Sequence, residues 1–259
     1  MTDLAEQVGS HIWYHCIELP SGVVTPGLFD TRGAAKKVPL PASLDGKRCL
    51  DVGTADGFWA FEMERRGARE VVAIDLIDPM KRDAAGGRSA PVRAGDEAGR
   101  LTNFELARDA LGSKVEWRNL SVYDLASADV GEFDFVFMGS LLLHLRDPVG
   151  ALAAIRSVTR GEFLSYDTVS PWLTVLHPRM PVARLKGTEI DWWTPNVAGL
   201  RRMIEAGGFE IVRAGGLSFQ GWRGKEFRLR PLLKHPVTML MLRFVGVPQS
   251  WVFARPASR

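Results

Sequence analysis

The chain has 259 residues, of which 46% are hydrophobic and 24% are charged. This composition suits a globular α/β domain that builds its own core without metals or disulfides. The formal net charge of +3 is too small to indicate a nucleic-acid-binding protein by itself. The first residues lack a basic segment followed by an apolar stretch, and no run approaches the roughly 20 apolar residues of a membrane span. We therefore expect a cytoplasmic protein without a membrane span.

Two cysteines, Cys16 and Cys49, lie far apart and outside any Cys-x-x-Cys or Cys/His pattern. Such usage argues against a disulfide framework and against a zinc site. Cys49 lies inside an apolar run and is interpreted as a buried core thiol. The sequence predicts no metal site.

Residues 1–46 are interpreted as an N-terminal extension or lid rather than as a separate domain. Within it, the apolar positions predict one face of a short helix, formed by Ile12, Trp13, Cys16 and Ile17. Pro20 would end that helix. Residues 23–41 are rich in glycine and proline, and we expect them to wrap the core as a loop.

From residue 47 onward, short apolar runs alternate with helical segments, which is typical of a parallel sheet covered by helices. The expected strands are 48–52, 71–75, 115–120, 133–138, 162–166, 209–212 and 251–254. The expected helices are 58–66, 101–111, 148–158 and 198–206. Asp147 followed by Pro148 is a typical start for the third of these helices. The sequence therefore predicts a Rossmann-like α/β fold over 47–259, with a seven-stranded, mostly parallel sheet and helices on both faces.

Three stretches interrupt this alternation. Residues 77–99 are rich in glycine and charge and predict a loop. Residues 168–195 and 217–248 are interpreted as insertions, since loops this long usually serve a function. The basic part of the second insertion, 223–243, is open to three interpretations: a solvated helix, a substrate lid or dimer contact, or a surface that binds anions.

The strongest motif runs from Asp51 to Gly57 with the sequence DVGTADG, directly after a strand and before a helix. Its small residues at 53, 55 and 57 allow a sharp turn and let a ligand lie against the backbone. A dinucleotide-binding fingerprint would require a glycine where Phe58 stands. About 20 residues later, Asp75 ends the second strand, where a carboxylate can accept hydrogen bonds from vicinal ribose hydroxyls.

On these motifs the chain, from about residue 40 to its end, resembles the class I S-adenosylmethionine-dependent methyltransferases. Within that superfamily it is most similar to the bacterial tRNA carboxymethoxyuridine methyltransferase group. The closer likeness rests on three segments, 49–53, 140–144 and 194–196.

The resemblance implies a set of contacts to S-adenosylmethionine. The methionine portion would lie against the loop residues Asp51, Gly53, Thr54, Ala55 and Gly57. The ribose would meet Asp75 and Leu76, the adenine Ser121 and Val122, and the lower edge of the cofactor Met138, Gly139 and Ser140. The superfamily usually has an acidic residue at position 121, so the hydroxyl of Ser121 or the amide of Val122 would replace that contact.

One departure from the tRNA-modifying group concerns its carboxylated cofactor. Leu143 stands where that group has a tyrosine that binds the extra carboxylate, and leucine donates no hydrogen bond. A lysine for the same carboxylate is missing near Gly33, although Lys36 and Lys37 are close. We therefore expect ordinary S-adenosylmethionine as the cofactor, and the case for tRNA is weaker.

The chemistry of methyl transfer requires a base only where the acceptor atom carries a proton. His144 follows the fourth strand at the edge where open α/β sheets bind ligands, and it is the leading candidate. His15 is the second. The candidate substrate contacts are Tyr14, Asp167, Trp192, Trp193 and Asn196. Each of these residues also has a structural interpretation, as a packing, capping or turn-forming residue.

The leading hypothesis is a methyltransferase that acts on an oxygen or nitrogen of a small, biosynthetic substrate. A tRNA-modifying methyltransferase is the first alternative, and a protein that binds S-adenosylmethionine without turnover is the second. A dehydrogenase is disfavoured by Phe58. The sequence leaves the oligomeric state and the identity of the substrate open.

Overall fold

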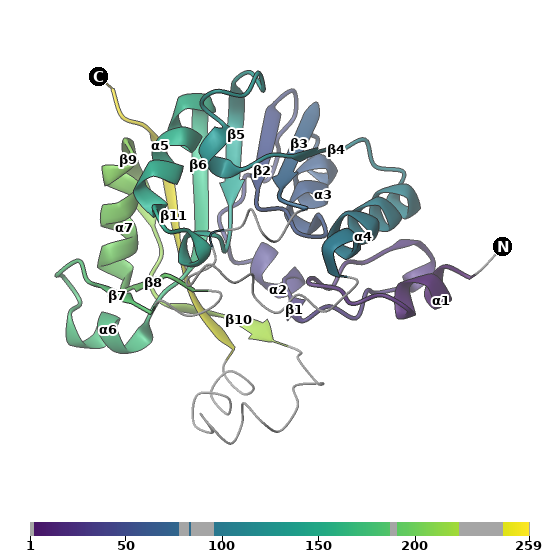
Figure 1. Ribbon diagram of the computed structural model, residues 1–259, viewed down its shortest axis with the longest axis horizontal. Helices are drawn as coiled ribbons and strands as arrows, with labels where there is room; N and C mark the ends of the chain where they lie inside the picture. Colours follow the sequence, from purple (N-terminus) through teal and green to yellow (C-terminus); the bar gives the residue numbers. More distant parts are fainter. Residues whose placement is uncertain (1–2, 78–82, 84–95, 187–190, 223–245, 259) are drawn as a thin grey trace.

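The computed structural model describes residues 3–77, 83, 96–186, 191–222 and 246–258 (Figure 1). Its centre is a nine-stranded sheet of order β1-β10-β11-β6-β5-β2-β3-β4, in which β9 also pairs with β11. The strands are β1 Phe29–Asp30, β2 Arg48–Val52, β3 Glu70–Asp75, β4 Glu116–Asn119, β5 Phe133–Met138, β6 Thr159–Thr168, β9 Phe209–Ala214, β10 Ser218–Trp222 and β11 Val247–Pro256. The Rossmann-like fold class is confirmed.

Strands β2 to β6 pair in parallel, whereas β11 runs antiparallel to β6, β9 and β10. All seven expected strands are present. The prediction of seven was nevertheless two short, because β1 and β10 extend the sheet beyond β11. β1 has only two residues, and β10 lies in a segment interpreted as an insertion. Neither carries the long apolar run by which the central strands were recognised.

The sheet buries both of its faces in separate apolar clusters. On one face, strand residues such as Cys49 and Phe135 pack against α3 (Phe58–Arg65) and α4 (Asp96–Leu111). On the other, their chain neighbours Leu50 and Val136 pack against α5 (Pro148–Val158) and α7 (Val197–Ala206). This alternation follows from the two-residue period of a strand. Helices thus cover both faces, as expected.

Helix ends agree with the sequence signals to within a few residues. The carboxylate of Asp147 accepts a hydrogen bond from the Gly150 amide and caps α5, as predicted. Helix α4 begins at Asp96, five residues before the expected start, so the end of the predicted 77–99 loop is helical. The rest of that loop lies outside the described residues, apart from 77 and 83.

The N-terminal helix was predicted in the wrong place. Helix α1 spans Leu4–Gly9, whereas residues 12–17 are extended. Ile12 is 58% exposed, and Trp13 is buried. The extended segment forms backbone hydrogen bonds with residues 25–29, among them Cys16 N to Phe29 O at 2.9 Å. Pairing with this distant segment, which a local helical pattern does not reveal, replaces the helix.

The first insertion contains α6 (Pro171–Leu176) and a hairpin of β7 (Ala183–Leu185) and β8 (Trp193–Pro195). Asn196 attaches the insertion to α7. Its amide nitrogen donates to the carbonyls of His177 and Met180, and its oxygen accepts from the amides of Val182 and Gly199. In the second insertion, β10 and the start of β11 are described, whereas the basic segment 223–243 lies outside the described residues.

The fully buried Asn196 generates a stability prediction. The substitution Asn196→Ala removes four hydrogen bonds, one of which caps α7, and we expect the free energy of unfolding to fall by about 2–3 kcal/mol in urea denaturation. Asn119→Ala is the matched control, because Asn119 is exposed and accepts one hydrogen bond, from the Ile77 amide. Equal losses for the two variants would contradict this role for Asn196.

Candidate active site

The loop after β2 turns sharply against the end of β3. The amides of Gly53 and Thr54 both donate to the carbonyl of Ile74, at 2.9 and 3.1 Å. Gly53 and Ala55 have φ angles of 78° and 51°, a left-handed region that favours glycine. The Ala55 amide donates to Asp75 Oδ2 at 2.8 Å. The predicted loop and the predicted ribose carboxylate are therefore in direct contact.

Asp75 is surrounded by further donors. Its Oδ1 accepts from the Leu76 amide at 2.7 Å, and Arg100 Nη1 lies 3.4 Å from Oδ2. The carbonyl of Asp75 accepts from the Leu120 amide, which places Ser121 beside the end of β3. Ser121 caps a short 3₁₀ helix, Val122–Asp124, through the Tyr123 amide.

The end of β5 completes this edge of the sheet. The Met138 side chain is fully buried in the core below the edge. Gly139 follows, and Ser140 Oγ donates to Gln249 Oε1 at 2.9 Å. A Cβ atom placed on Gly53 would lie 3.3 Å from the Leu141 side chain. All the predicted cofactor residues thus gather at the carboxyl ends of β2, β3, β4 and β5, and their individual roles stay predictions.

Asp51 is a buried carboxylate at the end of β2. Burial raises the pKa of Asp51 to about 7, and the hydrogen bond from Thr54 Oγ1 at 2.7 Å opposes this rise. The anion is therefore costly in the folded chain, and a nearby cation would favour it.

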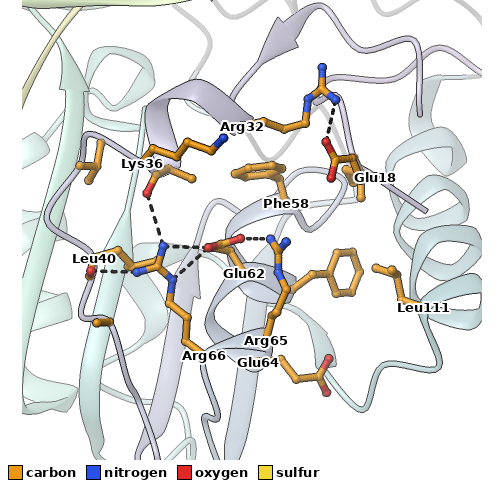
Figure 2. A pocket seen from close by; sticks show the side chains of 15 residues that line it. Glu18, Arg32, Lys36, Leu40, Phe58, Glu62, Glu64, Arg65, Arg66 and Leu111 are labelled. Atoms are coloured by element: carbon orange, nitrogen blue, oxygen red, sulfur yellow. Dashed lines mark hydrogen bonds and ion pairs between the residues drawn. The ribbon is translucent and has the colours of Figure 1, made fainter. Parts of the chain in front are cut away.

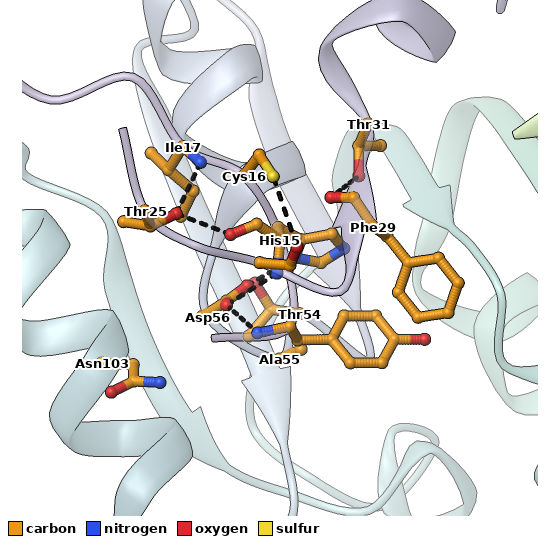
Figure 3. Close-up of polar contacts among 12 residues, drawn as sticks. His15, Cys16, Ile17, Thr25, Phe29, Thr31, Thr54, Ala55, Asp56 and Asn103 are labelled. Carbon is orange, nitrogen blue, oxygen red and sulfur yellow. Dashed lines mark hydrogen bonds and ion pairs between the residues drawn. The ribbon is translucent and has the colours of Figure 1, made fainter. Parts of the chain in front are cut away.

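A second carboxylate, Asp56, attaches the N-terminal segment to the same loop (Figure 3). Its Oδ2 accepts from the amides of Tyr14 and His15 at 2.8 and 2.9 Å, and its Oδ1 lies 2.5 Å from His15 Nδ1. The carbonyl of His15 accepts from Thr25 Oγ1. His15 is only 4% exposed. Its described contacts are those of a residue that fixes the N-terminal segment, and Asp56 is a site residue that sequence reasoning missed.

His144 lies on the 3₁₀ turn Leu142–His144, directly after β5. Its Nδ1 is 3.5 Å from Asp191 Oδ1, and Asp191 Oδ2 is 2.9 Å from Lys186 Nζ. The Trp192 amide donates to the Leu143 carbonyl at 2.7 Å and so fixes the hairpin against this turn. Asp191 was not singled out in the sequence, since it stands in an insertion and 47 positions after the histidine.

Asp167 supports the turn from below. Its Oδ1 accepts from the amides of Leu141 and Leu142 at 2.8 and 3.0 Å, and its Oδ2 accepts from Ser165 Oγ. Burial raises the pKa of Asp167, and these hydrogen bonds oppose the rise. Both oxygens thus accept hydrogen bonds from the protein, and the substrate role of Asp167 stays a prediction.

The two tryptophans of the hairpin also form hydrogen bonds at this edge. Trp192 Nε1 donates to the carbonyl of Asp83 at 2.5 Å, and Trp193 Nε1 donates to the carbonyl of Arg146 at 3.1 Å. Asp83 in turn accepts from the Tyr123 hydroxyl and the Arg146 amide. Both indoles are half-buried. They therefore connect the hairpin to the loops that follow β3 and β5.

Tyr14 is attached through its amide to Asp56 of the loop after β2, and it feels the charge of Asp191 in the hairpin. Burial raises the pKa of Tyr14 to about 12, and the Arg100 cation opposes the rise. Three carboxylates within electrostatic reach add to it: Asp56, Asp75 and Asp191. The phenol is therefore protonated at neutral pH and is available as a hydrogen-bond donor near these three groups.

Two cavities border α2 (Arg32–Ala35) on the face of the sheet that carries α3. The first cavity, of about 720 Å³, lies between α2 and α3, and Figure 2 shows Arg66 among the residues that line it. Arg66 donates to the carbonyls of Leu40 and Pro41 and to Glu62, so it ties the N-terminal extension to α3. The second, of about 840 Å³, lies between α2 and β10, and Lys36 and Lys37 line it.

The described chain contains no helix long and apolar enough to cross a membrane. Cys16 and Cys49 are both buried thiols, and burial raises the pKa of Cys49 to about 12. Cys49 is therefore a thiol of low reactivity, as expected.

A family model described as a methyltransferase domain matches residues 30–214. The chain belongs to the class I S-adenosylmethionine-dependent methyltransferases. The matched region includes the loop after β2, Asp75, Ser121 and His144, and every strand from β2 to β9.

Two kinds of methyltransferase are represented among the relatives. The ubiquinone biosynthesis O-methyltransferase of Hahella chejuensis is 33% identical over 130 residues, which cover 50% of this chain and 46% of that protein. The tRNA U34 carboxymethyltransferase of Ectopseudomonas mendocina is 27% identical over 184 residues, which cover 71% and 51%. This methyltransferase chain therefore spans about half the length of these two relatives. The ubiquinone biosynthesis O-methyltransferase of Xanthomonas axonopodis is 31% identical over 190 residues, or 70% of each chain.

Solved structures show the same fold at low identity. The [4+2]-cyclase SpnF has a TM-score of 0.57 at 16% identity, covering 99% of this chain and 93% of its own. The magnesium protoporphyrin IX methyltransferase of Synechocystis, solved with S-adenosylmethionine bound, has a TM-score of 0.51 at 13% identity, covering 88% and 78%. The cyclase name indicates that this fold alone does not define the reaction.

The raised pKa of Asp51 predicts how stability changes with pH. The folded chain binds this proton more tightly than the unfolded chain, so Asp51 costs stability as pH rises from its ordinary pKa of 3.8 to about 7. We expect Asp51→Asn to gain about 2–3 kcal/mol of unfolding free energy relative to the parent chain between pH 5 and pH 8. Urea denaturation at both pH values measures this, and a constant difference between the two proteins would contradict it.

Proposed function

We propose that this methyltransferase transfers the methyl group of S-adenosylmethionine to an oxygen or nitrogen of a small molecule, with His144 as the base. The observation that carries the proposal is the shared turn after β5. Its Leu141 side chain lies 3.3 Å from the place that a Cβ on Gly53 would take, and its His144 faces Asp191 of the hairpin. A base on this turn would lie beside the methyl group to be transferred.

The proposed reaction is a single displacement. A lone pair of the acceptor oxygen or nitrogen forms a bond to the methyl carbon while the carbon–sulfur bond breaks and its electrons return to sulfur. The products are the methylated acceptor and S-adenosylhomocysteine. The proton of the acceptor passes to the imidazole of His144, and the Asp191 carboxylate stabilises the cation that forms. Alignment of the three atoms in a site shielded from water contributes the remaining acceleration.

For the cofactor, we assign the ribose hydroxyls to Asp75 and the cationic methionine portion to the loop that begins at Asp51. The positive charge would favour the Asp51 anion, which burial disfavours. We assign the lid role to residues 1–46, which Asp56 attaches to this loop. Tyr14, held by the same attachment, is proposed as a hydrogen-bond donor to the substrate.

Two features support a small molecule as the acceptor. Leu143 stands where the resemblance implies a tyrosine for the carboxylated cofactor, and the hairpin is fixed by Trp192 and Trp193 against the turn that carries His144. The likeness to tRNA U34 carboxymethyltransferases makes tRNA the competing acceptor. Incubation with methyl-labelled S-adenosylmethionine and either total tRNA or a small-metabolite extract tests the choice. We expect label among small molecules, and abundant label in RNA would overturn the proposal.

A loss-of-function variant tests the base. We expect His144→Gln to lower the rate of label transfer by about 10²-fold or more, without changing cofactor affinity, since removal of a general base slows only the chemical step. His177→Gln is the matched control in the neighbouring insertion. Unchanged transfer by His144→Gln would remove His144 from the mechanism.

A binding variant tests the ribose contact separately. We expect Asp75→Ala to weaken binding of S-adenosylhomocysteine by roughly 1–3 kcal/mol in calorimetry, because it strands ribose hydroxyls and releases the Ala55 amide. Asp109→Ala is the control, since the Asp109 side chain is 72% exposed on α4. Equal affinities for the two variants would count against the assignment.

A further inference from the structure

The first insertion exposes an unusual concentration of apolar side chains. Eleven large apolar residues of the described chain are exposed, and five of them lie between residues 172 and 185. They are Trp172 at 72%, Val175 at 69%, Leu176 at 55%, Met180 at 55% and Leu185 at 58%. We call these five residues the α6 patch. A group of exposed apolar side chains on a protein surface often marks an interaction site.

The α6 patch is presented by a fixed backbone. On α6, Trp172, Val175 and Leu176 have the spacing of one helix face. The polar side chain of Thr174 turns inward instead, accepting from the Val197 amide and donating to the Ser170 carbonyl. Asn196 holds the following segment through the carbonyls of His177 and Met180. The polar contacts thus face the body of the protein, and the apolar face is directed outward.

The acidic and basic residues within the segment 168–186 that carries the α6 patch are of one sign. No aspartate or glutamate occurs from residue 168 to residue 186. Arg179 and Arg184 are exposed, and neither forms an ion pair with another residue in the described ranges. Lys186 pairs with Asp191. An apolar face with tryptophan, flanked by uncompensated arginines, is the pattern of proteins that rest on an anionic bilayer.

A second copy of the chain would fit the α6 patch less well than an anionic bilayer. In a twofold dimer the same surface meets itself, so Arg179 and Arg184 of the two copies would approach each other with no acid within 168–186 to pair with them. Lipid phosphates would instead accept hydrogen bonds from both guanidinium groups. A peripheral contact also requires no helix that crosses the membrane.

We propose that the α6 patch docks the protein onto a bilayer that contains anionic phospholipids, with Trp172, Val175 and Leu176 inserted at the level of the headgroups and Arg179 and Arg184 on phosphates. Figure 1 shows α6 and the β7–β8 hairpin projecting beside α7, at one end of the molecule. The bilayer would therefore contact the insertion without displacing the sheet. The same hairpin carries Asp191, so the docked face adjoins the turn of His144.

Vesicle flotation with the full chain tests this surface. We expect co-flotation with vesicles of equal parts phosphatidylcholine and phosphatidylglycerol, and at least about tenfold weaker partitioning to phosphatidylcholine alone or in 0.5 M salt. Trp172→Ala combined with Leu176→Ser should lower partitioning about tenfold or more. Val212→Ser is the matched control, because Val212 is 55% exposed on β9, outside the patch.

A charge variant and a mass measurement complete the test. Arg179→Glu with Arg184→Glu leaves the apolar face intact and should also reduce binding to phosphatidylglycerol about tenfold or more. Circular dichroism establishes that each variant is folded. Absence of flotation by the parent chain, or equal flotation by the parent chain and both double variants, would overturn the proposal. So would light scattering that shows a dimer which only the Trp172/Leu176 variant dissociates, because the α6 patch would then be an interface between copies.

Discussion

The parallel pairing of β2 with both β3 and β5 is the constraint on which the site depends. Leu50 lies opposite Val72 on one side and Val136 on the other. Three carboxyl ends therefore meet at one edge of the sheet, and each continues into a loop with a polar or glycine residue. Residues that are 20 and 88 positions apart come together as a result: the Ala55 amide donates to Asp75, and Gly53 lies beside the Leu141 side chain.

Buried polar side chains that accept hydrogen bonds from backbone amides fix the loops at this edge. Asp56 secures the N-terminal segment, Asp167 the turn after β5, and Asn196 the first insertion. Each satisfies amides that would be costly if they were buried unpaired. Removing such an acceptor would release a whole segment, whereas removing an exposed charge would affect little beyond its own surroundings. The candidate functional side chains are thus supported by residues that need not touch a ligand.

The sequence was most informative where local chemistry and the apolar pattern agree. The DVGTADG loop, Asp75 and the seven principal strands were all located, because turn residues and continuous apolar runs mark buried parallel strands. Residues 12–17 were misread, since their apolar spacing suits a helix while their pairing with 25–29 is non-local. Asp56 and Asp191 were missed for the same reason. Their partners, His15 and His144, are 41 and 47 positions away, and no spacing rule connects them.

The imidazole–carboxylate contact between His15 and Asp56 has a consequence for how this protein can change over evolutionary time. A chain shortened to its apparent domain start at residue 47 would lose the three nitrogen atoms of Tyr14 and His15 that contact the Asp56 carboxylate in the loop after β2. The extension and the loop are therefore coupled through one carboxylate. An N-terminal segment taken from a relative would find the same hydrogen-bond acceptor only where position 56 is acidic. Substrate preference, to the extent that the extension sets it, would then diversify by substitution within the segment rather than by replacement of the whole.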